Sequence, residues 1–308
     1  MEDQLRTTTT PYRRIAGVLA ALMIGSAAAF AAPASAMAEI IDPDEPYDGI
    51  EGNFTGGDVT DPGLEQPTDD QTNLKLQISQ EWYAVNVQGA DPTQLTKLQN
   101  DYTAQYGDSG YVDPGDGAGL RTTAASSRIL PFVQYAQAKG YYCGPASGYM
   151  IIRYLHGSGY TSRYNGNSLS QANLANSAHM NTEANKSTTW TSKRFATGIN
   201  RWRNVPWYVQ VPKPSGSLLP KIFTHSVGGN GMPIGADTVE FAGGSHYNGH
   251  PTNKTIGHWI VGYGYVQSGQ NTTWADPATS VWSSTKKSFT YTTSTFATRF
   301  LQSNGVVY

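Results

Sequence analysis

The clearest hydrophobic pattern in the chain lies in residues 148–155, where apolar side chains recur at helical spacing. The apolar face that this spacing creates consists of Met150, Ile151, Tyr154 and Leu155. Pro145 precedes the pattern and suits the first turn of a helix, because that turn leaves its amide hydrogens unpaired in any case. The sequence therefore predicts a helix whose N-terminus lies at Cys143.

A strand pattern follows in residues 257–265, where side chains alternate between two faces. One face is expected to carry Trp259, Val261, Tyr263 and Tyr265, and the other His258, Ile260 and Gly262. A turn at residues 268–271 leads into a second strand that ends at Asp276, before Pro277. Antiparallel pairing of the two strands would bring Asp276 to His258. Residues 122–308 are thus expected to form one α+β domain, with a helical half followed by an antiparallel sheet half.

The N-terminal residues have the pattern of a targeting segment. Three arginines precede an apolar run from Ile15 to Ala32, and small residues follow at 34–36, which is typical of a signal peptide over residues 1–38. A retained membrane anchor is the alternative, because the run is long for a signal peptide. No later stretch is apolar enough to span a membrane. We therefore expect a secreted, extracellular protein without stable membrane insertion after cleavage.

Residues 39–121 are expected to be an acidic, partly disordered N-terminal segment. They include 17 acidic and 3 basic residues, a net charge of −14, and none of the basic residues precedes Asp70. Within this segment Leu74, Leu76 and Ile78 alternate, whereas Leu95, Leu98 and Tyr102 have helical spacing after the turn at Asp91-Pro92. A small folded element is expected there, and residues 107–120, rich in Gly and Asp, are expected to be a linker.

The charge of the domain has the opposite sign. Residues 122–308 include 4 acidic and 15 basic residues, a net charge of +11. This asymmetry allows two interpretations of residues 39–121: a solubilising spacer, or an intramolecular pro-segment that covers the cleft by charge attraction until it is removed. Because the basic residues are mostly scattered singly, nucleic acid is not an expected partner, and an anionic cell-wall surface fits better.

Cys143 is the single cysteine of the chain, so it cannot form an internal disulfide. It is either a small buried hydrophobic residue or a reactive thiol. A helix N-terminus stabilises negative charge and lowers the pKa of a thiol there, which favours the reactive thiolate. Gln137, six residues earlier, is near enough for its amide to help complete an oxyanion hole, and Gln134 is the less favoured candidate.

A cysteine nucleophile needs an imidazole base and a third group that orients the ring. All six histidines follow Cys143, and His258, at the start of a strand and beside Gly257, suits a base. His246 and His250 have the spacing of a metal-binding pair on a helix, but the glycines and Pro251 around them indicate a loop, so no metal site is expected. Asp276 and Asp237 both lie on probable neighbouring strands and are the candidates for the orienting carboxylate.

The motifs of this chain follow one another in a recognisable order: a glutamine before Cys143-Gly-Pro-Ala, then a helix, then Gly257-His-Trp-Ile-Val and Asp276-Pro. This ordered set resembles that of the papain-like cysteine peptidases related to bacteriocin-leader processing peptidases. The similarity is to their secreted, peptidase C-thirty-nine-like branch and covers about residues 126–303. It includes Leu169–Leu174 and Phe195–Asn200, which look like intervening helices of the family.

This resemblance implies a papain-like fold and a peptidase that forms a thioester with a peptide or protein substrate. Cys143 would be the nucleophile, His258 the base, Asp276 the orienting residue and Gln137 an oxyanion donor, without a metal or organic cofactor. Cleavage after double glycine is not carried over, because the leader peptidases are fused to transporters and no such region is present in this sequence. A cell-wall amidase, a transglutaminase-like acyltransferase and an inactive binding protein of the same fold remain alternatives.

Overall fold

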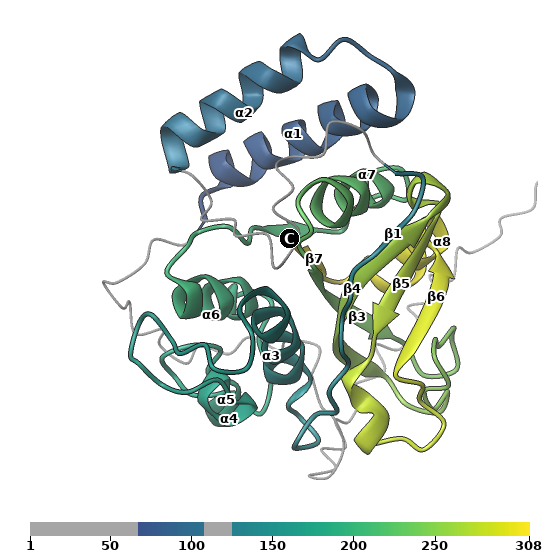
Figure 1. Cartoon of the computed structure of the whole chain (residues 1–308). Helices are drawn as coiled ribbons and strands as arrows, with labels where there is room; N and C mark the ends of the chain where they lie inside the picture. The colour runs from purple at the N-terminus through teal and green to yellow at the C-terminus, as the bar shows by residue number, and fades with distance from the viewer. Residues whose placement is uncertain (1–66, 108–124) are drawn as a thin grey trace, which may run out of the picture. The chain divides into compact units, whose positions relative to one another are not determined.

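A computed structural model describes residues 67–107 and 125–308 (Figure 1). The predicted signal peptide at 1–38, residues 39–66 of the predicted acidic segment and the predicted linker after Gly107 lie outside these residues. The α-helices are α1 (Asp69–Gln88), α2 (Thr93–Tyr106), α3 (Cys143–His156), α4 (Gln171–Leu174), α5 (Thr182–Asn185), α6 (Arg194–Arg203), α7 (Leu219–Phe223) and α8 (Thr293–Phe300). Three short helices of other types are η1 (Thr224–Gly229), η2 (Gln267–Gly269) and η3 (Pro277–Ser280). Within the described ranges, no helix combines the length and the apolar character needed to cross a membrane.

The acidic segment contains a helical hairpin, α1–α2. Thr68 caps α1 by accepting a hydrogen bond from the amide of Gln71, and Gly89 ends the helix with a φ of 77°. Asp69 and Asp70 of the acidic segment lie in the first turn of α1. The alternation of Leu74, Leu76 and Ile78 is misleading, because all three lie within α1. Three apolar residues are too few to distinguish a strand from a helix.

One side of α1 is buried against the rest of the protein. The side chain of Lys75 is 1% exposed, and its Nζ donates hydrogen bonds to the backbone oxygens of Trp207 (2.6 Å) and Tyr308 (2.9 Å). The same Nζ lies 3.6 Å from the centroid of the Trp207 ring. Ser79, one turn later, contacts Nδ1 of His225 at 2.8 Å and the Tyr308 hydroxyl at 2.9 Å. The hairpin is therefore built into the folded protein through buried polar contacts.

A seven-stranded sheet follows, in which every pair of neighbouring strands is antiparallel. Its order is β2-β7-β3-β4-β5-β6, and β1 pairs with β4. The strands are β1 (Arg128–Ile129), β2 (Gln210–Pro212), β3 (Ile234–Glu240), β4 (Ile256–Val266), β5 (Asn271–Ala275), β6 (Ser288–Thr292) and β7 (Gly305–Val307). The predicted pairing of the histidine strand with the strand after it is confirmed by β4 and β5.

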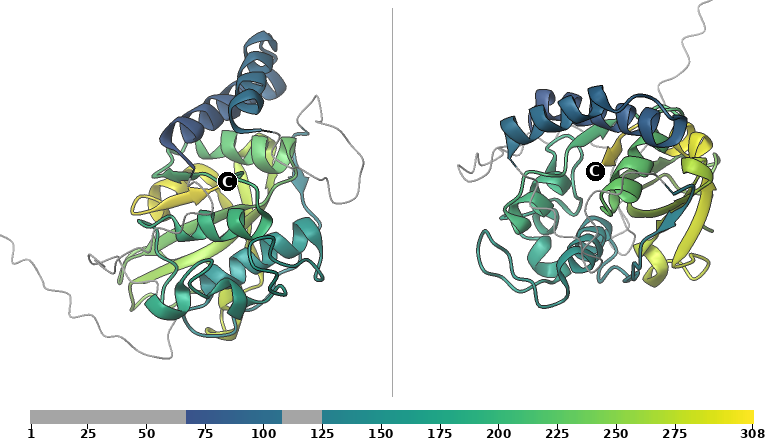
Figure 2. Two further views of the ribbon diagram at one scale, coloured as in Figure 1. Left: turned by 90° about the vertical axis from the view of Figure 1, so that its left-hand side faces the viewer. Right: turned by 45° about the horizontal axis from the view of Figure 1, so that its top comes forward.

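Hydrophobic clusters cover the two faces of the sheet. Trp259 and Val261 of β4 pack with Ile151 of α3 and Ile199 of α6 in one cluster. The other cluster joins the opposite face of β4 to α7 and α8, through Ile260, Phe223, Phe296 and Phe300. Figures 1 and 2 show α3 and α6 on the side of the sheet away from α8. The predicted α+β fold is confirmed, with helices in the first half and an antiparallel sheet in the second, consistent with a papain-like fold.

A β-bulge in β4 overturns one detail of the predicted strand. Gly262 pairs with Trp274 and Gly264 with Thr273, so Tyr263 is an extra residue on β4. The extra residue reverses the alternation, and Tyr265 joins Ile260 in the α7–α8 cluster instead of sharing the face of Trp259. His258 lies before the bulge and keeps its predicted position opposite the Trp259 face.

Candidate active site

Cys143 is the first residue of α3, as predicted, and its side chain is 0% exposed. Pro145 lies in the first turn, and Gly144 packs against Thr188. A Cβ at position 144 would lie 2.0 Å from Oγ1 of Thr188, so only glycine fits next to the cysteine. The helix start therefore holds the thiol at a fixed, buried position where amide groups stabilise negative charge.

Helix α3 is fastened to the histidine strand one turn after Cys143. Oγ of Ser147 donates a 3.0 Å hydrogen bond to the backbone oxygen of Trp259, the residue after His258. The Trp259 indole in turn donates to the backbone oxygen of Thr188 at 2.9 Å and stacks on Phe195, with ring centroids 4.1 Å apart. The helical half and the sheet half are thus joined by buried contacts beside the predicted nucleophile and base.

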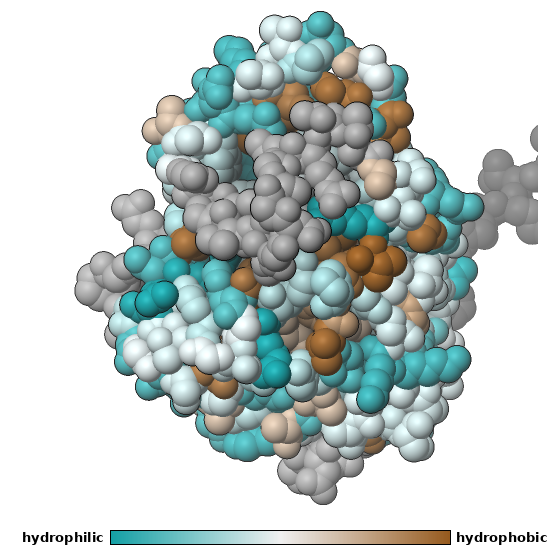
Figure 3. Space-filling model, in the orientation of Figure 1, coloured by the Kyte–Doolittle hydropathy of each residue, from teal (hydrophilic) through white to brown (hydrophobic). Residues whose placement is uncertain are grey.

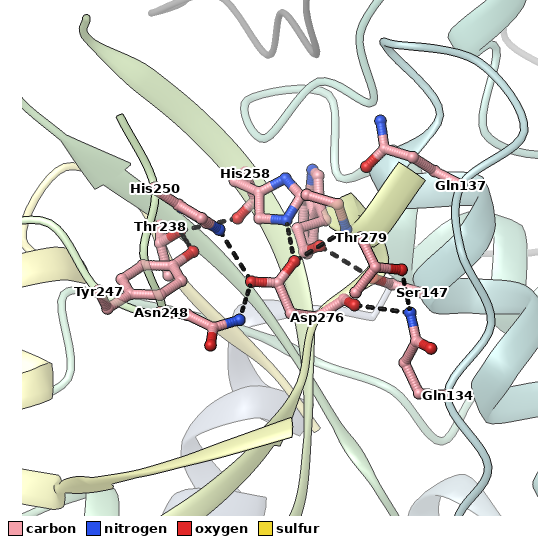
Figure 4. Close-up of polar contacts among 12 residues, drawn as sticks. Gln134, Gln137, Ser147, Thr238, Tyr247, Asn248, His250, His258, Asp276 and Thr279 are labelled. Carbon is pink, nitrogen blue, oxygen red and sulfur yellow. Dashed lines mark hydrogen bonds and ion pairs between the residues drawn. The ribbon is translucent and has the colours of Figure 1, made fainter. Parts of the chain in front are cut away.

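Asp276 lies directly after β5, where the β4–β5 pairing brings it beside His258. Oδ1 of Asp276 accepts hydrogen bonds from Nε2 of His258 and from the amide of Ala278, both at 2.9 Å. Oδ2 accepts from Nε2 of His250 (2.9 Å) and from Nδ2 of Asn248 (2.8 Å). Figure 4 shows the carboxylate between the two imidazoles. Burial by itself raises the pKa of Asp276, but the two histidines outweigh it and hold the pKa well below its usual range.

The carboxylate fixes the tautomer of His258. Because the ionised Asp276 can only accept, Nε2 of His258 must carry a hydrogen. Nδ1 of His258 is buried and has no hydrogen-bond partner among the described residues. In the neutral ring, this atom holds the lone pair that can take a proton.

The thiol lies within electrostatic range of the same cluster. Burial raises the pKa of Tyr247 well above its usual value, and Glu240, Asp276 and Cys143 raise it further. The hydroxyl of Tyr247 bonds to Oγ1 of Thr238 at 2.7 Å, and Oγ1 of Thr238 donates to the backbone oxygen of His258 at 2.9 Å. At the junction of α3, β4 and β5, His258 and Asp276 are therefore hydrogen-bonded to each other, and Cys143 begins the helix that Ser147 fastens to β4. All three residues are buried.

Asp237, the rival orienting residue, lies on the other face of the sheet. The β3–β4 register places Thr238 opposite His258 and Asp237 opposite Trp259. Oδ2 of Asp237 accepts a 2.9 Å hydrogen bond from Nδ2 of Asn304. The alternation of side chains thus directs this carboxylate away from the His258 ring.

Both candidate oxyanion glutamines have their amide hydrogens engaged. Nε2 of Gln137 donates to the backbone oxygens of Lys139 (2.9 Å) and Gly140 (2.5 Å), and its Oε1 is buried without a partner within the described ranges. Nε2 of Gln134 donates to the backbone oxygen of Asp276 and to Thr279. Gln134 therefore supports the Asp276 segment, and Gln137 would have to turn its amide to donate to an oxyanion.

The contact between Glu240 and His250 was not predicted from the sequence. The two residues lie at the end of β3 and in the β3–β4 loop, and Nδ1 of His250 is 2.6 Å from Oε1 of Glu240. His246, the other member of the predicted pair, faces the backbone oxygens of Gly244 and Lys254 and does not share these partners. A pattern search could not find these contacts, because they connect residues through a loop without periodicity.

The cluster also contains atoms of the type that bind metal ions. His250, His258 and Asp276 each offer a ligand atom, and these atoms lie within 4.8 Å of one another. The imidazole nitrogens, however, already point at the carboxylate at hydrogen-bond distance. A metal would have to replace the protons that hold this arrangement together.

The protein surface carries apolar side chains on the segment that leads to Cys143. Ile129 and Val133 are 51% and 60% exposed, and Val133 lines a groove with Met150 and Arg153 of α3. Figure 3 shows hydrophobic residues gathered in the middle of a mostly hydrophilic face.

Comparison with known proteins identifies the domain. A sequence model described as the Peptidase_C39 like family matches residues 129–308, more than half of the chain. Searches of curated proteins and of solved structures give no match. The matched region contains the whole junction of α3, β4 and β5, and the helices predicted at 169–174 and 195–200 are present there as α4 and α6. The chain belongs to the Peptidase_C39 like family and is, in general terms, a cysteine peptidase.

Proposed function

We propose that the protein is a secreted peptidase that hydrolyses peptide bonds through Cys143, His258 and Asp276. The observation that carries this proposal is the 2.9 Å contact between Nε2 of His258 and Oδ1 of Asp276, which leaves Nδ1 of His258 as a buried base. Cys143, the single cysteine, begins the helix that Ser147 fastens next to this base. These contacts support the assignment of a nucleophile, a base and an orienting carboxylate to Cys143, His258 and Asp276.

In the proposed reaction, the Cys143 thiolate attacks the carbonyl carbon of a peptide bond. The carbon–nitrogen bond breaks, His258 gives the proton on Nδ1 to the leaving amine, and a thioester remains on Cys143. Water then loses a proton to Nδ1 and attacks the thioester, which releases the carboxyl product and the thiolate. Asp276 stays ionised and stabilises the charged ring. The backbone amide of Cys143 and, after a turn of its side chain, Gln137 would stabilise the oxyanion.

The test compares the protein lacking residues 1–38 with its Cys143→Ala variant on a peptide library and on peptidoglycan. We expect cleavage of peptides by the parent protein and none by the variant. Because the chain has one cysteine, iodoacetamide can alkylate only Cys143, and this modification should abolish cleavage as well. If the protein released peptidoglycan fragments but cleaved no peptides, it would be a cell-wall amidase and the peptidase proposal would be wrong. No Cys143-dependent reaction on either substrate would indicate an inactive binding protein.

A further inference from the structure

A second histidine lies behind the proposed triad. His250 is buried, and its ring stands between two carboxylates, with Nε2 2.9 Å from Oδ2 of Asp276 and Nδ1 2.6 Å from Oε1 of Glu240. Glu240 is also buried and accepts a 3.0 Å hydrogen bond from the amide of Tyr247 on its second oxygen. The rings of His250 and His258 are 5.3 Å apart and nearly perpendicular, with Asp276 bonded to both.

The geometry determines the charge of His250. Carboxylate oxygens accept hydrogen bonds and cannot donate them, so both nitrogens of this ring must carry hydrogens. Such a ring is an imidazolium. Burial lowers the pKa of His250, but the hydrogen bonds and charges of Asp276 and Glu240 outweigh burial and raise it to about 9. His250 is therefore a buried cation at neutral pH.

Two carboxylates and one cation leave one negative charge in this cluster. Glu240 balances the charge of His250, and Asp276 remains able to pair with a protonated His258. His250 and Asn248 also occupy Oδ2 of Asp276, so that Oδ1 is turned to His258. With the amide of Ala278 as the fourth donor, the carboxylate cannot rotate without losing a buried hydrogen bond.

We propose that Glu240 and His250 are positioning residues of this site: Glu240 keeps His250 charged, and His250 holds Asp276 in the orientation that His258 needs. This inference rests on the proposed function, because it assigns the two residues to the Cys143, His258 and Asp276 reaction. Neither residue touches the reacting atoms. Both act through Asp276.

The arrangement predicts a dependence on alkaline pH. When His250 loses a proton, a bare nitrogen faces a carboxylate oxygen, and either Asp276 or Glu240 loses its donor. Four titratable groups face His250 directly: Glu240 at the end of β3, Tyr247 in the same loop, His258 in β4 and Asp276 after β5. Cys143 of α3 acts on Tyr247 and so is an indirect neighbour. Lys286 contacts this loop only through its backbone oxygen, which accepts from Asn248.

The experiment uses the protein lacking residues 1–38, with Glu240→Gln, His250→Gln and the control His246→Gln. Glutamine at 240 can keep the bond from the Tyr247 amide through its single oxygen, and its NH₂ group then faces Nδ1 of His250. The substitution therefore removes both the charge and the acceptor that keep His250 protonated. His246 lies in the same loop and faces only backbone oxygens. Peptidase kcat and KM are measured against pH, and nitrogen NMR of the histidine rings follows protonation in the Cys143→Ala background.

We expect both ring nitrogens of His250 to be protonated at pH 7 in the parent. In Glu240→Gln, His250 should lose its second ring proton at a lower pH than in the parent. The alkaline limb of the profile of kcat against pH should shift to lower pH by the same number of pH units, with KM unchanged. His250→Gln should lower kcat by about 10- to 100-fold, as for other supports of a reacting group. His246→Gln should leave both measurements unchanged.

A neutral His250 ring at pH 7 in the parent protein would overturn the proposal without any variant having to fold. The proposal would also be overturned if His250 titrated at lower pH in Glu240→Gln while the alkaline limb of kcat stayed at its parental pH. Glu240 and His250 would then have a structural role only. If the parent shows no Cys143-dependent cleavage, the proposed function fails instead. The NMR result still decides whether Glu240 keeps His250 charged.

Discussion

Ser147 donates a hydrogen bond from Oγ to the backbone oxygen of Trp259 over 3.0 Å, and this contact joins the cysteine helix to the histidine strand. Ser147 follows Cys143 by one helical turn, and Trp259 follows His258 directly. The separation of the proposed nucleophile and base is thus set by a buried side chain that touches neither.

Ser147→Ala should loosen this junction. It leaves the buried Trp259 oxygen without its donor, which we expect to lower the free energy of unfolding by about 1–3 kcal/mol. It should also lower kcat more than it changes KM, because the relative position of Cys143 and His258 is affected. Urea unfolding and steady-state kinetics measure the two effects. Ser158→Ala, at an exposed position after α3, is the control, and equal behaviour of the two variants would contradict the role of Ser147.

Asp276→Asn should damage the reaction while keeping the size of the side chain. All four groups around the carboxylate donate hydrogen bonds, so an amide NH₂ must oppose at least one of them. Loss of the correct His258 tautomer is expected to lower kcat by roughly 10²- to 10⁴-fold. Asp237→Asn alters a buried carboxylate on the opposite face and should leave kcat unchanged. An Asp276→Asn enzyme with parental kcat would remove Asp276 from the proposed triad.

Lys75→Met tests the attachment of the α1–α2 hairpin. Methionine keeps an apolar stem but removes the donor from the backbone oxygen of Trp207, whereas the oxygen of Tyr308 keeps the amide of Val209. The free energy of unfolding should therefore fall by about 1–3 kcal/mol. Lys97→Met, on the exposed side of α2, should have little effect. Urea unfolding and the rate of proteolysis within residues 67–107 provide the comparison. Equal stability of the two variants would show that Lys75 does not secure the hairpin.

The pro-segment prediction for residues 39–121 can be sharpened. Contacts of α1 reach Pro206, Trp207, His225 and Tyr308, which lie outside the proposed triad. Deletion of residues 1–121 should therefore lower the folding yield and the melting temperature, since it exposes these buried polar partners. If the shortened protein instead gave parental yield and higher activity, the hairpin would act as an inhibitory segment.

Acid pH should destabilise the protein through His225. Nε2 of this buried ring lies 3.0 Å from the amide nitrogen of Asn230, which donates, so the ring is neutral. Burial and the charge of Lys75 lower the pKa of His225 to about 3, below the roughly 6.5 of an unfolded chain. The unfolded state therefore binds a proton first, and the free energy of unfolding falls as pH drops from about 6.5 toward 3.

Asn230→Asp replaces the donor facing His225 with an acceptor and should flatten this decline. The measurement is the midpoint of urea unfolding as a function of pH. Asn173→Asp makes the same substitution at a half-buried position of α4 and should keep the parental slope. Identical slopes in all three proteins would contradict the assignment of the acid transition to His225.

The features that the sequence predicted well are those with local patterns. Helix α3 begins at Cys143 and β4 carries His258 because periodicity, Pro145 and the turn at 268–271 act over a few residues. Contacts between distant residues left no such pattern. The His250–Asp276 bond spans 26 positions through an irregular loop, and the β-bulge at Tyr263 reversed a face that strict alternation had assigned to Tyr265. The hydrogen bonds of Gln137 depend on a loop conformation that its spacing from the cysteine does not specify.

The contact between Lys75 and Tyr308 also has a consequence for the order of assembly. The two residues are 233 positions apart, so the first described helix is secured by a backbone oxygen next to the last strand. During synthesis from the N-terminus, the bond from Lys75 to Tyr308 cannot form until the residues of β7 and Tyr308 have been made. This contact therefore forms late, and contacts of such long sequence separation slow folding. A chain interrupted before β7 would lack Tyr308, so Lys75 would lose one of its two buried backbone acceptors, a state that proteases and chaperones can recognise.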